Sequence, residues 1–201
     1  MSSVDAKQQN AFPIWIAVVF VAYIAMAAFQ KYAIYPVEAK LLPLYSQYAS
    51  LMYLPHAVRV LATTIYGSKT FFVLLPAILF ETFLFYPMTD GLLSLTTLSI
   101  AIIGATCAPV AFILIKLIGG ALVPGFDATR AAFNWRYVFA GGIIASAINS
   151  IGLTAFFFDL SDFAAASLAM VRFFLGDTIG LLASLIMLTF VFRIIRGVNE
   201  V

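Results

Sequence analysis

Leu92 to Ile118 decides the fold class, and it reads LLSLTTLSIAIIGATCAPVAFILIKLI, an apolar run whose single charged side chain is Lys116. A helix of roughly 20 such residues crosses the hydrocarbon layer of a bilayer. The rest of the chain is similar, because 64% of its 201 residues are apolar and 10% are charged, against about 45–50% and about 25% in soluble domains. The sequence therefore predicts a protein whose main solvent is lipid.

Six apolar segments are long enough, or nearly so, to cross the membrane as helices. The second is the least apolar, and Pro55-His56 interrupts it, so we expect a kink or an unwound stretch there. Between the first two segments, two prolines in Gln30 to Leu44 predict a loop. Residues 121–137 fit either a short helix in the headgroup layer or a plain loop. We predict an all-α polytopic bundle of transmembrane helices, a single integral membrane domain over residues 1–201, with spans at about 12–29, 45–66, 70–86, 92–118, 138–158 and 164–192.

The basic residues of the expected loops fall unequally on the two sides of the membrane. Two of them, Lys31 and Lys40, lie on one side, and seven lie on the other. Because loops rich in Lys and Arg stay in the cytoplasm, we expect both termini to be cytoplasmic. The seven residues are Lys7, Lys69, Lys116, Arg130, Arg136, Arg193 and Arg196.

Four charged residues and the one histidine fall inside the expected spans. A charge in hydrocarbon is costly, so such residues face the bundle interior and often mark a ligand site. Arg59 and Glu81 flank the turn at Gly67 at similar depth, and we expect them to form an ion pair. Two interpretations stay open: a buried structural network, and a polar cavity that holds a small polar or anionic solute or relays protons. The candidate polar residues are His56, Arg59, Glu81, Arg172 and Asp177.

Small residues recur at every fourth position in the fifth and sixth expected spans. This spacing lets two helix backbones approach closely, and it predicts that these two spans pack against each other. Asp177 adjoins the second of the two stripes, which places its carboxylate near a seam between helices. The helix-packing residues are Gly142, Ser146 and Ser150 in the first stripe, and Gly176, Gly180 and Ser184 in the second.

The motifs of the common enzyme classes are missing from the sequence. It has no phosphate-binding glycine loop, no nucleophile elbow and no zinc motif with two histidines, so we expect no catalytic residues and no cofactor. Cys107 is the only cysteine and His56 the only histidine, and we expect no metal site because too few ligands exist. The net charge of +2 gives no reason to expect a nucleic acid as partner.

Three features follow one another along the chain: Pro55-His56, then Gly67 ahead of Pro76, and Leu175 to Gly180, which reads LGDTIG. In these features the chain resembles the membrane-associated sensor (MASE-type) domains of bacterial signalling proteins. The resemblance implies a protein of the bacterial inner membrane that perceives a ligand or a partner transporter in signal transduction. In that family a kinase or cyclic-nucleotide domain usually follows. Because none follows here, we expect signalling through a partner protein.

Two other functions fit the same sequence. One is a solute-binding membrane subunit of a transporter, which would hold its ligand near the outer leaflet with Arg172, Asp159 and Asp162 and would need an energising partner. The other is a structural accessory subunit of a larger membrane complex. The expected partners are the lipid bilayer, another membrane protein and, for the sensor and the transporter subunit, a small polar or anionic ligand.

Overall fold

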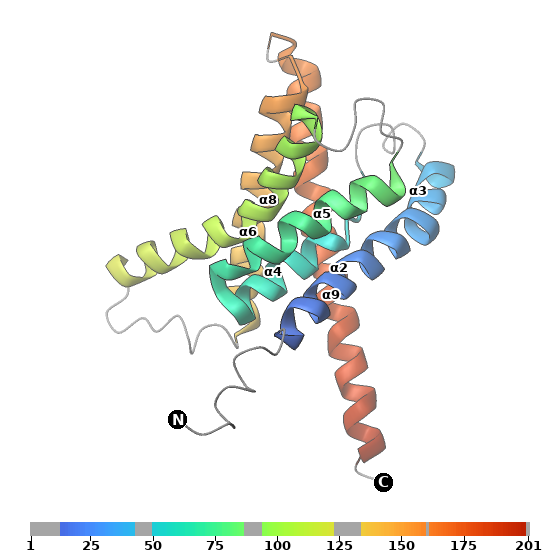
Figure 1. The fold of residues 1–201 in the computed structure, drawn as a ribbon, viewed down its shortest axis with the longest axis vertical. Coiled ribbons are helices and arrows are strands. Elements are labelled where there is room, and N and C mark those ends of the chain that lie inside the picture. Colours follow the sequence, from blue (N-terminus) through green and yellow to red (C-terminus); the bar gives the residue numbers. More distant parts are fainter. Residues whose placement is uncertain (1–12, 43–49, 87–93, 123–133, 160, 200–201) are drawn as a thin grey trace, which may run out of the picture.

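The computed structural model of the chain describes residues 13–42, 50–86, 94–122, 134–159 and 161–199. Helices make up nearly all of these ranges, and none of them contains a strand. The all-α fold class is therefore confirmed, and Figure 1 shows the helices as one bundle. The elements are α2 (Ile14–Phe29), η1 (Gln30–Ile34), α3 (Tyr35–Leu41), α4 (Pro55–Tyr66), η2 (Gly67–Thr70), α5 (Phe71–Phe85), α6 (Leu95–Leu122), α8 (Trp135–Phe157) and α9 (Phe163–Asn199).

Within the described ranges, five helical stretches are long and apolar enough to cross a membrane. The number is close to the six that the sequence predicts. The difference arises in the second and third predicted spans, which the structure joins into the single stretch Pro55–Phe85. The other four stretches are Ile14–Leu41, Leu95–Gly119, Trp135–Phe157 and Phe163–Arg196.

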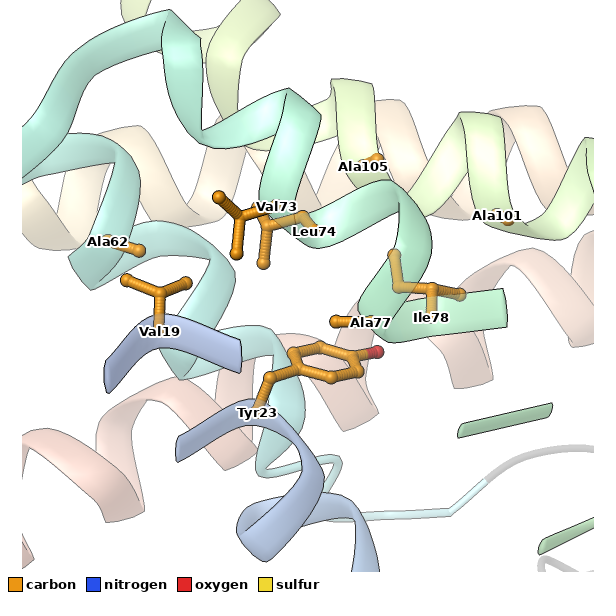
Figure 2. Packing of buried hydrophobic residues seen from close by; sticks show 9 residues of the cluster. All are labelled: Val19, Tyr23, Ala62, Val73, Leu74, Ala77, Ile78, Ala101 and Ala105. Atoms are coloured by element: carbon orange, nitrogen blue, oxygen red, sulfur yellow. The ribbon is translucent and has the colours of Figure 1, made fainter. Parts of the chain in front are cut away.

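The stretch Pro55–Phe85 is a hairpin of two short helices, α4 and α5. Gly67 lies at the bend with a φ of 73°, a conformation that glycine adopts without steric cost. Across the bend, the Oγ1 atoms of Thr63 and Thr70 lie 3.1 Å apart. Ala62 of α4 and Leu74 of α5 belong to one buried cluster (Figure 2). The chain therefore reverses its direction between the two helices, and both helices pack against α2.

The predicted span 45–66 is not one continuous helix. Pro55 begins α4, and residues 50–54 before it are not helical, which agrees with the expected unwound stretch. With 12 residues, α4 is about 18 Å long, too short to cross the hydrocarbon layer alone. Residues 43–49 of the same prediction lie outside the described residues.

The first helical stretch is longer than the sequence predicts. It passes from α2 through the π-helical η1 into α3 and ends at Leu41, so most of the predicted loop from Gln30 to Leu44 is helical. Pro36 lies in the first turn of α3, directly after the π-helical turn η1, and it does not end the helical stretch. π-Helical turns often occur at functional sites, and this one buries Gln30.

The later helices also extend beyond their predicted bounds. α6 continues through Gly119 to Leu122, and α9 continues past residue 192 to Asn199. Asn134 caps α8, because its side-chain Oδ1 accepts a hydrogen bond from the backbone N–H of Arg136 at 3.0 Å. Residues 123–133, where the headgroup-layer helix or plain loop is expected, lie outside the described residues.

Two buried clusters of mainly small and apolar side chains hold the helices together. One joins α2, α4, α5 and α6 and includes Tyr23 and Leu74 (Figure 2). The other joins α4, α6, α8 and α9 around Val60 and Leu181. Large apolar side chains also cover the outside of the bundle, such as Phe72, which is 78% exposed. A lipid solvent accepts such a surface without penalty, and water does not.

Aromatic contacts show which helix ends lie together. Trp15, at the start of α2, stacks on Tyr66 with ring centroids 4.9 Å apart, and Lys69 Nζ lies 5.0 Å from the centroid of the Trp15 ring. At the other end of α2, Lys31 Nζ lies 5.0 Å from the centroid of the Tyr86 ring. The bend between α4 and α5 therefore lies beside the start of α2, and the end of α5 lies beside the end of α2.

Candidate functional site

A network of buried polar side chains extends from α4 into the centre of the bundle. Arg59 is 4% exposed, and its Nη2 donates hydrogen bonds to the hydroxyls of Tyr23 at 2.9 Å and Tyr53 at 3.2 Å. The same hydroxyls donate to the carboxylate of Glu81, from Tyr23 to Oε2 at 2.6 Å and from Tyr53 to Oε1 at 3.2 Å. Two opposite charges thus share two phenols at the centre of the molecule.

The predicted ion pair between Arg59 and Glu81 is therefore a bridged pair. A phenol accepts a hydrogen bond from a guanidinium and donates one to a carboxylate at the same time, so each tyrosine links the two charges. Sequence reasoning missed Tyr23 and Tyr53, because tyrosines of a membrane protein are typical of the interfacial belts. The only signal was their position inside the expected spans 12–29 and 45–66, the second of which also contains Arg59.

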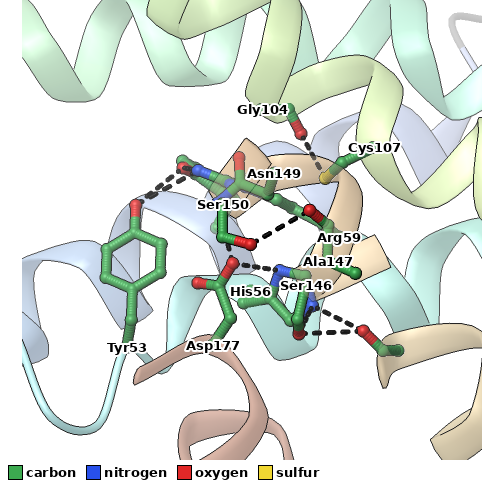
Figure 3. A network of polar contacts seen from close by, with 12 residues as sticks. Tyr53, His56, Arg59, Gly104, Cys107, Ser146, Ala147, Asn149, Ser150 and Asp177 are labelled. Atoms are coloured by element: carbon green, nitrogen blue, oxygen red, sulfur yellow. Dashed lines mark hydrogen bonds and ion pairs between the residues drawn. The ribbon is translucent and has the colours of Figure 1, made fainter. Parts of the chain in front are cut away.

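A second branch of the network surrounds His56, which has no exposed surface. His56 Nδ1 lies 3.5 Å from Asp177 Oδ2, and Asn149 Nδ2 donates to the same oxygen at 2.7 Å. On the other side of the ring, Nε2 lies 3.1 Å from Ser146 Oγ and 3.3 Å from the carbonyl oxygen of Gly142. Figure 3 shows this branch beside Arg59. The predicted residues His56, Arg59 and Asp177 therefore come together, from α4 and α9, with Asn149 of α8.

The two small-residue stripes pack against different partners. A Cβ atom at Gly142 would collide with the side chain of Leu181, so the first stripe packs α8 against α9 as predicted. Gly176 and Gly180 instead face the backbone of Ser50–Tyr53, and a Cβ atom at either position would collide with a carbonyl oxygen there. This corrects the prediction that the second stripe packs against α8. The serines of the stripes, Ser146, Ser150 and Ser184, are all buried.

Side chains from the first helical stretch hold the non-helical residues 50–54 in place. Glu38 accepts hydrogen bonds from the backbone N–H groups of Leu51 at 3.2 Å and Met52 at 3.0 Å. Gln30 Oε1 accepts from the N–H of Leu54 at 3.1 Å. Backbone that leaves a helix at membrane depth is tolerated where protein groups satisfy it. We name residues 50–54 the bridging segment, because it also donates a hydrogen bond from Tyr53 N–H to the Gly176 carbonyl of α9 at 2.9 Å.

A cavity of about 420 Å³ lies against the network. Its volume falls within the range of about 300–1,000 Å³ that is usual for small-molecule sites. The polar and charged residues that line it are Gln30, Lys31, Tyr35, Ser50, Tyr53, Arg59, Tyr86, Asn149 and Asp177. The apolar part of the wall consists of Ile100, Gly104, Leu153 and Phe173.

Two polar atoms of the lining residues are buried without a hydrogen-bond partner. They are Arg59 Nε, a donor, and Asn149 Oδ1, an acceptor. Gly104 lets the guanidinium lie close to α6, because a Cβ atom there would be 3.2 Å from Arg59 Cζ. Both atoms belong to residues of the cavity wall, and neither has surface that a water molecule could touch.

Of the five predicted polar residues, Arg59 and Asp177 line the cavity, and His56, Glu81 and Arg172 are not among the residues of its wall. Arg172 is the one that also lies apart from the hydrogen bonds described above. It lies half-buried on α9, five residues before Asp177 in the sequence. Glu81 is also outside the wall but reaches it through Tyr53. In the described part of the chain, no three His, Cys, Asp or Glu side chains come together as a metal site requires.

Comparison of the chain with models of protein families, with curated proteins and with solved structures gives no match. The site must therefore be interpreted from its own geometry.

Proposed function

We propose that this chain binds a small polar solute in the cavity beside Arg59 and reports the binding to a partner protein, as a sensor in a bacterial inner membrane. The proposal depends on one observation: the buried residues Arg59, Asn149 and Asp177 line an open volume of about 420 Å³. A buried polar or charged group is costly unless it is hydrogen-bonded and paired. A solute with complementary groups supplies further partners to these side chains, which favours an occupied cavity.

A purely structural network explains less of the geometry. Such a network satisfies its own members, as Tyr23 and Tyr53 do for Glu81. It gives no reason for an open volume next to a charged guanidinium, because a buried charge is stable only when it is paired and hydrogen-bonded.

One helix connects the cavity with a part of the chain that a partner can reach. Phe173 and Asp177 line the cavity from α9, which continues unbroken to Asn199. From Ile186 to Arg196 every side chain of this helix is exposed. A solute that shifts Asp177 would move α9 as a rod and present the change to a membrane partner. The positive-inside count assigns this end to the cytoplasm.

A pair of tryptophan variants on α8 tests the proposal. Leu153 lines the cavity, whereas Ile151, on the same helix, is 57% exposed. Leu153→Trp fills the cavity, and Ile151→Trp adds the same side chain to the lipid-facing surface. We expect mass spectrometry of the purified proteins to detect a retained solute in the wild type and in Ile151→Trp, and much less of it in Leu153→Trp.

Two results would contradict the proposal. One is an equal amount of retained solute in Leu153→Trp and in the wild type, which would place the solute outside the cavity. The other is that no solute is found in any of the three proteins and that all three have the same melting temperature. Copurification of a transporter ATPase would favour the transporter subunit over the sensor.

A further inference from the structure

We infer that the solute is a small zwitterion with an apolar side chain, of the α-amino acid class. The inference rests on the proposed function, because it assigns a chemistry to the occupant of the same cavity.

The first argument is that charges of both signs surround the cavity. Lys31, Arg59 and Asp177 line it, and two further carboxylates reach its wall through hydrogen bonds, Glu81 from Tyr53 and Glu38 from Ser50. A ligand with opposite charges at its two ends meets both kinds of group, and each of its charges then has a partner in a poorly solvated site.

The second argument is the chemistry of the buried polar residues in the wall. Arg59 lines the cavity, and a guanidinium prefers a carboxylate. Asn149 and Asp177 line it as well, and the amide nitrogen of Asn149 donates to Asp177 Oδ2 at 2.7 Å, so an amide and a carboxylate lie close together. An ammonium group suits the oxygen acceptors of this pair.

Lys31 strengthens the carboxylate side of the site. Its Nζ lies 5.7 Å from the centroid of the Tyr35 ring and 5.0 Å from that of the Tyr86 ring. Among the described residues its contacts are thus aromatic rings, and it lines the same cavity. These rings carry no negative charge, and a ligand carboxylate would give the ammonium group of Lys31 an anionic partner.

The third argument is the apolar part of the wall. Ile100, Leu153 and Phe173 line the cavity together with the rings of Tyr35 and Tyr86. Small inorganic ions have no apolar surface that these side chains can bury, and a sugar has only the C–H face of its ring. An aliphatic or aromatic side chain does, and its burial is favourable in proportion to its area.

Binding of four related probes tests this chemistry. Wild-type protein in lipid nanodiscs is titrated with L-phenylalanine, L-leucine, 3-phenylpropionate and phenethylamine, and the change in melting temperature gives the affinity. We expect both amino acids to bind. The propionate lacks the ammonium and the amine lacks the carboxylate, so each should bind about ten- to a hundredfold more weakly than phenylalanine.

Two variants test which residue binds the carboxylate of the ligand and which binds its ammonium group. Arg59→Gln should weaken phenylalanine binding about tenfold or more and should not weaken phenethylamine binding, because the amine has no carboxylate and gains from the loss of a nearby positive charge. Asn149→Ala should weaken both phenylalanine and phenethylamine and leave the propionate unchanged. Asn149→Ala also serves if Arg59→Gln does not fold, and Ile151→Trp controls for a general effect of substitution.

The outcomes separate this inference from the proposed function. Equal binding of the propionate or of phenethylamine would overturn the zwitterion and leave a cavity that binds an anion or a cation. Absence of binding by all four probes, while the wild type retains a solute that Leu153→Trp lacks, would overturn the zwitterion alone. Absence of both probe binding and retained solute would overturn both proposals.

Discussion

Replacement of Tyr23 by Phe removes one oxygen atom from the centre of the polar network and leaves the ring in place. That hydroxyl belongs to a fully buried side chain, donates to Glu81 at 2.6 Å and accepts from Arg59 at 2.9 Å. A hydrogen bond to a charged group contributes about 1.5–3 kcal/mol. Because Tyr53 keeps one bond to each charge, at 3.2 Å, we expect the free energy of unfolding to fall by about 2–4 kcal/mol.

The assay is reversible unfolding in mixed micelles with increasing dodecyl sulfate, followed by circular dichroism. Tyr32→Phe is the matched control, because Tyr32 is 71% exposed and the same atom is removed from the surface. We expect that control to stay within about 0.5 kcal/mol of the wild type.

The link to Glu81 is tested by a double-mutant cycle. Once Glu81→Gln has removed the negative charge, loss of the Tyr23 hydroxyl should cost less, and the two variants should be non-additive by about 1–2 kcal/mol. If Tyr23→Phe costs no more than Tyr32→Phe, the bridged pair does not contribute to stability. Additive effects of Tyr23→Phe and Glu81→Gln would refute the coupling between them.

Two further predictions concern packing and topology. Gly180→Ala should reduce the free energy of unfolding by about 1–3 kcal/mol, because its Cβ meets the backbone of the bridging segment. Gly152→Ala is the control and should cost less, because its Cβ would meet a side-chain methyl group at 2.9 Å that can move; equal costs would contradict this reasoning. In a Cys107→Ala background, Lys69→Cys and Arg196→Cys should both react with a membrane-impermeant thiol reagent only after the cytoplasmic face is opened. Labelling of the two positions from opposite faces would refute the predicted topology.

The positions of the helices could largely be predicted from the sequence, because apolar length reports directly on the thickness of the bilayer. The same rule predicted a loop at Gln30 to Leu44, since polar residues and prolines there lower the apparent hydrophobicity. In the structure, Gln30 and Glu38 turn their polar groups to the bridging segment and remain in a helix. The sequence of one segment shows which of its side chains are polar. It does not show that a distant segment will form hydrogen bonds with them and allow the helix to continue.

The candidate site could be predicted only in part, for a similar reason. Charged residues in apolar spans are conspicuous, so Arg59, Glu81 and Asp177 could be selected from the sequence. The groups that connect them are tyrosine hydroxyls and an asparagine amide, which belong to residues that also serve as interfacial or packing side chains. Which tyrosine meets which charge depends on how the helices pack, and no spacing along the chain encodes that.

The bridging segment joins the two halves of the proposed mechanism. Its Tyr53 hydroxyl contacts Arg59 and Glu81, and its backbone lies against Gly176 and Gly180 of α9. Because these glycines leave no space for a Cβ atom, a movement of the segment cannot be absorbed by side-chain rotation and must be followed by the helix. A solute that engages the guanidinium of Arg59 shares it with Tyr53, whose hydroxyl accepts from Nη2 at 3.2 Å. Binding in the cavity would therefore act on α9 through the segment whose Ser50 and Tyr53 line it, even without direct contact between the solute and Asp177.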